Sequence, residues 1–204
     1  MVVGRSADAD GGSLRSVLLH ALEKFVLAAA RAPSVNESLN DVIGTASLLR
    51  MINAEDRLRE LGLVLPAPPA PMGTYAVAVL HGGTLYTSGN GPLRADGSYV
   101  TGCVGKDLTI EDGIAAARLT ALAMLATVRA QLGSLDRVAR IVKVLGFVRC
   151  VPEFTEPPKV INGFSDLMVQ VFGDRALGAR SAVGTAALPA GIAVEVEAIF
   201  AVTG

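Results

Sequence analysis

The chain has 204 residues, of which 51% are hydrophobic and 18% are charged, and this length suits one domain with an extension. Its 18 basic and 19 acidic residues leave a formal net charge of −1, so no overall positive field favours nucleic acid or an anionic membrane as a partner. No uniformly apolar run reaches the roughly 18 residues that a membrane span requires. We therefore expect a soluble, cytoplasmic protein.

Few side chains are available to bind a metal ion. Cys103 and Cys150 are the only cysteines, and neither belongs to a C-x-x-C spacing. His20 and His81 are the only histidines, so a histidine-rich metal site or a Ser-His-Asp triad would have to use one of them. We predict two reduced thiols, no metal ion and no organic cofactor.

The N-terminal part of the chain begins with a polar stretch and continues with a helical one. Residues 1–12 are small, polar and rich in glycine, as expected of a disordered terminus. Residues 13–31 have apolar side chains at helical spacing. A cleaved signal peptide is the alternative for this stretch, but polar and charged side chains interrupt the apolar core that such a peptide needs: His20, Glu23 and Lys24.

A second helical stretch is predicted from about Leu39 to Leu61. The proline-rich residues 65–72 then end it, because proline lacks an amide proton and restricts the residue before it to extended geometry. Met51 would itself make a natural start of the chain. We therefore predict an N-terminal extension over residues 1–50 and a single domain over residues 51–204.

The domain is predicted to open with a β-hairpin. Residues 75–80 and 84–88 have the composition of strands, and the turn Gly82-Gly83 lies between them. A third short strand is predicted at residues 98–101, after a turn that contains Gly97.

A long helix and a strand follow. Thr109 and Asp112 form a T-x-x-D capping signature, and the apolar residues after it are three or four apart as far as Gly133, which is expected to stop the helix. Residues 138–151 are rich in β-branched side chains and continuously apolar, which predicts a central strand covered on both faces.

A second helix and two strands complete the pattern. Thr155 and Pro157 are predicted to start the helix and Gly173 to end it. Residues 180–188 and 193–202 are predicted to be the final strands.

The resulting order is β-β-β-α-β-α-β-β, which indicates an α+β fold with a mixed sheet and both helices on one face. The other face would then be apolar and open to solvent unless other subunits cover it, so we expect an oligomer.

Four strings within this order resemble the RidA/YjgF family, whose members are trimers of a chorismate-mutase-like fold. The strings are LYTSG at 85–89, RSAVG at 180–184, LP at 188–189 and VEVEAI at 194–199. The resemblance covers about three quarters of the chain and points to a less characterised branch of the family. It implies a homotrimer with sites between subunits.

Arg180 and Glu195 are the residues to which the resemblance assigns chemistry. Arg180 corresponds to the family arginine that holds a substrate carboxylate, and its planar guanidinium suits a bidentate clamp. Glu195 corresponds to the glutamate that orients a water molecule, and it shares one strand face with Glu197 because the two are two residues apart.

Four further residues are expected to line the substrate pocket by the same resemblance: Tyr75, Ser88, Gly89 and Asn162. The chain also departs from the family pattern. Asn90 replaces the usual glutamine, Thr74 replaces a proline, and Ala182 lies where deaminases often have cysteine.

The resemblance implies hydrolysis of reactive 2-imino and 2-enamino acids to 2-keto acids and ammonia, with a small carboxylated imine or enamine metabolite as partner. A trimer that binds a carboxylate through Arg180 without catalysis is the main alternative. An endoribonuclease is a weaker one, because the charge is near neutral and no basic stripe is present.

Overall fold

Five strands form one mixed sheet in the computed structural model, which describes residues 53–203. The strand order is β1-β2-β5-β3-β4, and only β3 and β4 are parallel. This confirms the predicted α+β class. The bounds of the strands are β1 (Ala78–His81), β2 (Thr84–Thr87), β3 (Val138–Arg149), β4 (Ala179–Thr185) and β5 (Val194–Val202).

The helices begin and end close to the predicted signals. They are α3 (Ala54–Glu60), α4 (Ile110–Leu132) and α5 (Pro157–Phe172). Thr109 and Asp112 form a reciprocal capping box at the start of α4, and these hydrogen bonds to Thr109 lower the pKa of Asp112. Gly133 ends α4 in the left-handed region with φ of 80°.

The start of α5 differs slightly from the prediction. Pro157 is the first helical residue, as expected, but Glu156 is the N-cap residue and makes no side-chain cap bond. Thr155 therefore lies outside the helix. Proline suits this position because its missing amide would have no partner within the first turn.

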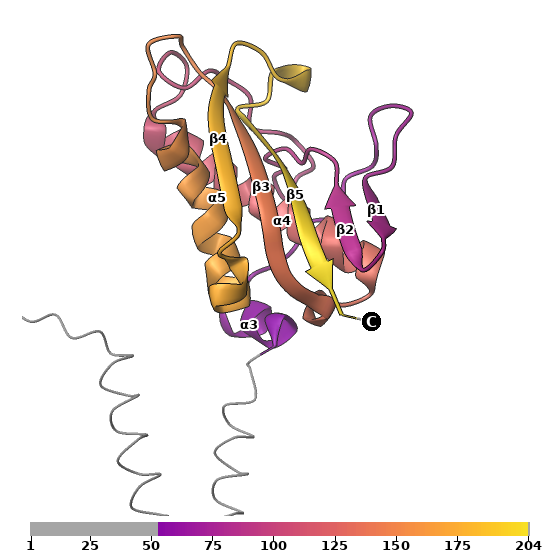
Figure 1. Ribbon diagram of the computed structural model, residues 1–204. Coiled ribbons are helices and arrows are strands. Elements are labelled where there is room, and N and C mark those ends of the chain that lie inside the picture. Colours follow the sequence, from indigo (N-terminus) through magenta and orange to yellow (C-terminus); the bar gives the residue numbers. More distant parts are fainter. Residues whose placement is uncertain (1–52, 204) are drawn as a thin grey trace, which may run out of the picture. The chain divides into compact units, whose positions relative to one another are not determined.

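Both long helices cover the same face of the sheet. In Figure 1, α4 runs behind the strands and α5 runs alongside β4. Alternate residues of the two central strands point into this layer and are buried, among them Val144 and Val148 of β3 and Val196 and Phe200 of β5. Gly146 lets the helix come close, because an added Cβ would lie 2.7 Å from the Cδ1 atom of Ile161 in α5.

On the opposite face of the sheet, no helix or strand of residues 53–203 forms a second layer. Leu145, Phe147 and Ile199 point to this side and are only partly buried. Among residues 53–203, β3 is therefore covered on one face only, and the cover predicted for its second face is not found there. The continuous apolar pattern arises because the second face is also rich in aliphatic and aromatic side chains, and these need a further partner to become buried.

The predicted third strand at residues 98–101 is also absent. Tyr99 and Thr101 make only isolated bridges, to Leu93 and Ile192. The segment is too short and too interrupted by turns to extend the ladder, so the observed order is β-β-α-β-α-β-β after α3.

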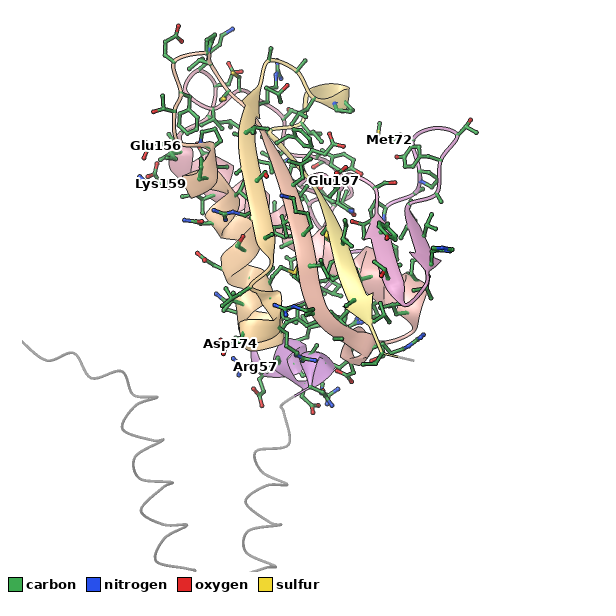
Figure 2. The ribbon with its side chains drawn as sticks, in the orientation of Figure 1. Arg57, Met72, Glu156, Lys159, Asp174 and Glu197 are labelled. Carbon is green, nitrogen blue, oxygen red and sulfur yellow. The ribbon has the colours of Figure 1, made fainter. Side chains whose placement is uncertain are left out.

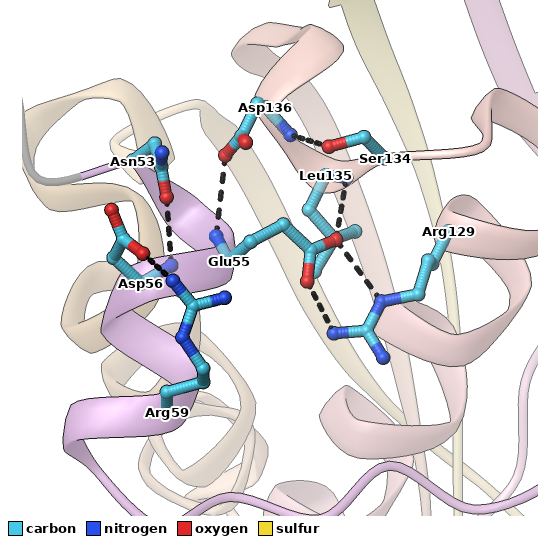
Figure 3. Close-up of polar contacts among 8 residues, drawn as sticks. All are labelled: Asn53, Glu55, Asp56, Arg59, Arg129, Ser134, Leu135 and Asp136. Atoms are coloured by element: carbon cyan, nitrogen blue, oxygen red, sulfur yellow. Dashed lines mark hydrogen bonds and ion pairs between the residues drawn. The ribbon is translucent and has the colours of Figure 1, made fainter.

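Helix α3 is fastened to the rest of the domain by Glu55 (Figure 3). Its carboxylate accepts from Arg129 Nε at 3.0 Å, from Arg129 Nη2 at 2.5 Å and from Leu135 N at 3.0 Å. Asn53 caps the helix by accepting from Asp56 N at 2.7 Å. Of the predicted helix over 39–61, only this end lies among the described residues. The predicted helix at 13–31 and the extension over 1–50 lie outside them.

Helix α4 has the length and hydropathy of a membrane span when length and composition are the only criteria, and it is the one such helix within residues 53–203. However, 61% of its most apolar window is buried inside the domain. This is the pattern of the core helix of a soluble domain.

Candidate functional site

A cavity of about 420 Å³ opens where the segment after β2 meets the strap of residues 65–72 and strand β5. Its wall contains four of the six predicted site residues: Tyr75, Ser88, Gly89 and Glu195. The other two, Arg180 and Asn162, do not line it. The remaining wall residues are largely apolar or small and include Val77, Tyr99, Pro189 and Ile192.

A β-bulge forms one side of the cavity. Tyr86 pairs with Ile199, and Asn90 pairs with Val196, so one more residue lies between the pairs on the β2 side than on β5. Bulges bend a strand, break its ladder locally and are frequent beside active sites. Here the bulge separates the backbone at Ser88 and Gly89 from regular pairing, which leaves room for the cavity.

Side-chain hydroxyls hold the backbone of the bulge. The Thr87 hydroxyl donates to Ala198 O at 3.2 Å and accepts from Ala198 N at 3.0 Å. The Ser88 hydroxyl donates to Ala76 O at 2.7 Å, and its amide donates to Val77 O at 3.0 Å. The cavity wall is thus hydrogen-bonded to both neighbouring segments and is preformed.

Glu195 extends its side chain across Gly89. A Cβ atom built on Gly89 would overlap Glu195 Oε1 and would lie 2.7 Å from Cδ and 2.9 Å from Cγ. No side chain at position 89 is compatible with this placement, so the absence of one is what lets the carboxylate lie against the backbone. Gly89 therefore determines where the carboxylate sits in the cavity.

Burial raises the pKa of Glu195, and the nearby charge of Glu197 raises it further. Both carboxylates leave the same face of β5, as predicted from their spacing, and both line the cavity. Glu197, which Figure 2 labels, is exposed, and Glu195 is half-buried. A carboxylate with a raised pKa is a stronger proton acceptor than an ordinary glutamate, which suits general base chemistry.

Two buried polar side chains, Asn90 in the cavity wall and Thr127 behind it, were not predicted as part of the site. Asn90 is 4% exposed and Thr127, in the middle of α4, is 1% exposed. The Thr127 hydroxyl donates to Asn90 Oδ1 at 3.0 Å, and Asn90 Nδ2 donates to Ser88 O at 2.9 Å. From the sequence, Asn90 stood out only as a departure from the family glutamine. A threonine within the apolar stripe of α4 was the available signal for Thr127.

The strap approaches the cavity through Tyr75. The amide of Met72 donates to the hydroxyl of Tyr75 at 3.1 Å, and both residues line the cavity. Pro69 and Ala70 complete this side (Figure 2 marks Met72). Tyr75 thus lies in the predicted place and holds the strap beside the carboxylates.

Arg180 lies on β4, the strand at the other edge of the sheet. Its guanidinium donates to Asn162 Oδ1 at 3.0 Å, to Ser165 Oγ at 2.9 Å and to Pro158 O at 3.3 Å. All three acceptors belong to α5. Arg180 and Asn162 are therefore brought together, as the resemblance implies, and the guanidinium remains exposed to solvent.

The two groups of predicted residues point to opposite faces of the sheet. Arg180 is in register with the buried Val144 and contacts α5, so its side chain is on the helix side. Glu195 is in register with Phe147 on the open side. Within one chain these side chains cannot act on the same small molecule.

Among the described residues, the cavity wall contains two carboxylates and no lysine, arginine or histidine. Three cations of β3 lie on the same sheet face and have partners: Arg140 Nη2 donates to Leu177 O at 3.5 Å, Lys143 Nζ to Ser181 Oγ at 3.0 Å, and Arg149 Nη1 to Gly191 O at 3.1 Å. Among residues 53–203, no group of three or more histidine, cysteine, aspartate and glutamate side chains gathers to hold a metal ion.

Comparison with known proteins gives a consistent result. Residues 55–198 match the family described as "YjgF/chorismate mutase-like, putative endoribonuclease". Protein TCP17 of Trypanosoma cruzi is 47% identical over 143 residues, which are 70% of this chain and 89% of that protein.

Two solved structures are similar in fold and sequence. The protein Atu1372 of Agrobacterium tumefaciens, whose function is described as unknown, is 42% identical, with a TM-score of 0.67 over 74% of this chain and 94% of that one. A "putative endoribonuclease" of Shewanella oneidensis is 30% identical, with a TM-score of 0.71 over 74% of this chain and 99% of that one.

Proposed function

The chain belongs to the YjgF/chorismate mutase-like family, which includes the RidA proteins, and we propose that it hydrolyses 2-imino and 2-enamino acids to 2-keto acids and ammonia. One observation carries this proposal: a preformed cavity holds a half-buried glutamate of raised pKa, Glu195, against the bare backbone of Gly89. The cavity volume of about 420 Å³ suits a small metabolite.

In the proposed reaction, Glu195 takes a proton from a water molecule whose oxygen attacks the imine carbon. The carbon–oxygen bond forms while the carbon–nitrogen double bond becomes single. Glu195 then passes the proton to nitrogen. As the carbon–nitrogen bond breaks and ammonia leaves, the hydroxyl oxygen forms the carbonyl double bond of the keto acid and releases its proton to Glu195. A protonated imine is already electrophilic, so the protein supplies orientation and a base.

Arg180 is proposed to hold the substrate carboxylate from a neighbouring copy of the chain. Two features support this arrangement: the cavity has no cation of its own, and Arg180 lies exposed at the opposite edge of the sheet beside Asn162. The open sheet face also presents partly buried apolar side chains that a second subunit would cover. We therefore propose a cytoplasmic homotrimer in which each site combines one cavity with one neighbouring Arg180.

Two alternatives give different outcomes in the same assays. A regulatory protein would bind carboxylates through Arg180 without turnover. An endoribonuclease, as the family and the Shewanella protein are described, would have to place a polyanion against Glu195 and Glu197, which repel phosphates. The carboxylates of the cavity therefore favour a small substrate with a positive or neutral reacting end.

The test uses purified full-length protein and 2-iminobutyrate or 2-aminoacrylate generated in the assay from the parent amino acid. We expect the protein to accelerate formation of the 2-keto acid over the uncatalysed rate. Arg180→Ala should lower kcat/KM by about 100-fold, because a charge-assisted bidentate bond is lost, and Arg180→Lys should recover only part of this loss. Ammonia release gives an independent measurement.

Three results would contradict the proposal. The first is a wild-type protein that leaves the rate of imine hydrolysis unchanged. The second is an Arg180→Ala variant with full activity. The third is cleavage of an RNA substrate that persists in Glu195→Gln. Binding of a 2-keto acid without turnover of the imine would identify the regulatory alternative instead.

A further inference from the structure

The hydrogen bond between Thr127 and Asn90 connects the core of the domain to the cavity. Thr127 lies on the face of α4 that packs against the sheet, and its hydroxyl reaches Asn90 Oδ1 at 3.0 Å. Both side chains are almost fully buried. Buried polar groups lower stability unless they are paired, and the low dielectric around this pair strengthens the hydrogen bond between them.

From Asn90 the contacts continue into the bulge. Its Nδ2 donates to Ser88 O at 2.9 Å, and its backbone exchanges bonds with Val196 at 2.8 and 3.0 Å. The side chain therefore holds the residue two places earlier, while the backbone is fixed to β5. Gly89 lies between these two points and has no freedom to move independently of them.

The contacts end at the reacting group of the proposed site. Glu195 lies against Gly89 with no room for even a methyl group between them. A shift of the Gly89 backbone would therefore move the Glu195 carboxylate, or let water surround it. Displacements of about 1 Å at a reacting group lower rates up to about 100-fold.

We propose that Thr127 and Asn90 are positioning residues of this site, which hold the Ser88–Gly89 bulge and thereby fix the Glu195 carboxylate in the cavity. The inference rests on the proposed deaminase function for its catalytic meaning, but the placement of Glu195 can be measured without any turnover. The side chain of Asn90 is long enough to reach from the bulge to the Thr127 hydroxyl.

The chain contains a closely matched control. Thr120 lies seven residues before Thr127 on α4, is fully buried, and donates to Ala116 O at 3.0 Å. The Thr127 hydroxyl also lies 3.1 Å from Ala123 O, so its one proton is shared between that carbonyl and Asn90 Oδ1. Thr127→Val and Thr120→Val therefore remove the same group from the same helix, and only the first removes a bond to Asn90.

The experiment compares kcat and KM for imine hydrolysis in wild type, Thr127→Val, Thr127→Ser and Thr120→Val. We expect Thr127→Val to lower kcat about 10-fold with KM within about twofold, since the carboxylate clamp is untouched. Thr127→Ser keeps the hydroxyl and should restore kcat. Thr120→Val should keep the wild-type kcat.

A second readout is the titration of Glu195, followed by carbon-13 NMR of the labelled carboxyl group. A loosened bulge admits water, so the raised pKa of Glu195 should fall toward its ordinary value in Thr127→Val and stay raised in Thr120→Val. If Thr127→Val does not yield folded protein, Asn90→Ala replaces it, because that change leaves Thr127 bonded to Ala123 O.

Equal effects of Thr127→Val and Thr120→Val on both readouts would overturn the inference, and so would an unchanged Glu195 titration in Asn90→Ala. A wild-type protein without imine hydrolysis would instead sink the proposed function, while the titration would still decide whether the bulge positions Glu195.

Discussion

The proposed site has two parts that differ in shape and charge: the cavity around Glu195, which we call the cavity half, and the part of β4 around Arg180, which we call the edge half. The cavity half is concave, partly apolar and negatively charged, and hydrogen bonds fix its wall from two sides. The edge half is exposed and positively charged, and its guanidinium is fixed by three acceptors from α5. The cavity half offers carboxylates, and the edge half offers a cation.

In the proposed function, this difference means that a single chain would make an incomplete site. A carboxylated imine needs a cation at one end and a base beside the reacting carbon. The sheet itself separates the two groups, because Arg180 extends on its helix side and Glu195 on its open side. Assembly of several copies is the arrangement that brings such halves together, and the predictions below test it.

The largest effect is expected from mixing two inactive variants. Arg180→Ala and Glu195→Gln should each lose about 100-fold or more in kcat/KM, because each removes one half of the site. In trimers reassembled from equal amounts of both, about a quarter of the sites combine an intact cavity with an intact neighbouring arginine. Activity should therefore return to about a quarter of the wild-type value, as measured by keto acid formation.

Mixing Arg180→Ala subunits with Arg180→Ala,Glu195→Gln subunits is the control, since no combination of these restores a site. Absence of recovery in the first mixture, with subunit exchange verified by mass spectrometry, would mean that the two halves do not share a site.

The next effect concerns the cavity half alone. Gly89→Ala places a methyl group where the Glu195 carboxylate lies, so either the carboxylate or the bulge must shift. We expect kcat to fall about 10- to 100-fold while binding of a non-reacting 2-keto acid, which depends on Arg180, changes little. Gly97→Ala, in an exposed turn with open space around its Cβ position but with φ of 85°, adds backbone strain without a clash and so controls for a loss of stability that does not reach the cavity. Unchanged kcat in Gly89→Ala would contradict the proposed role of Glu195.

A smaller effect is expected on the pH profile. Glu195 must be ionised to act as a base, so kcat/KM should fall as the pH drops through its raised pKa. The charge of Glu197 contributes to this shift but burial contributes more, so Glu197→Gln should move the acid limb of the profile to lower pH without bringing it to that of an ordinary glutamate. A limb that moves to higher pH, or does not move in a fully active variant, would contradict this electrostatic account.

The smallest effect on activity is expected from a residue remote from both halves. Glu55→Ala removes the bonds that fasten α3 to Arg129 and Leu135 and should lower stability by about 1 kcal/mol, or Tm by about 3 °C, because the pair is only partly buried. Glu60→Ala on the same helix breaks an exposed pair with Arg57 and should leave Tm nearly unchanged. Both variants should keep kcat within about twofold, and a large loss of activity in Glu55→Ala would show that the halves are coupled to α3.

The sequence predicted helix ends and turns well, because the hydrogen bonds that form them join residues only a few positions apart. Thr109, Asp112 and Gly133 set the ends of α4 as expected, because capping bonds and the left-handed C-cap involve only neighbouring backbone. The Gly82-Gly83 hairpin was predicted for the same reason. The supposed strand at 98–101 failed because pairing with a partner, and not composition, decides whether a short polar segment joins a sheet.

The site was predicted less completely than the fold. The family resemblance named Arg180, Glu195 and the residues near Ser88. The local signal for Thr127, a threonine within the apolar stripe of α4, does not point to Asn90, which lies 37 residues away in the chain. Threonine in the middle of a helix usually bonds back to its own helix, as Thr120 does, so its additional bond to the bulge became visible only when α4 was packed on the sheet.

By itself, the sequence determined that Glu195 and Glu197 share a face, where α4 begins and ends, and that helices alternate with strands, because these follow from the periods of strand and helix and from local hydrogen bonds. Only the tertiary structure decided which face Arg180 takes, that a bulge replaces regular pairing after Thr87, and that the arginine and the glutamate lie on opposite sides of one sheet. The reason is physical: the period of a strand tells which residues lie together, while long-range register and the packing of helices decide toward which side they point.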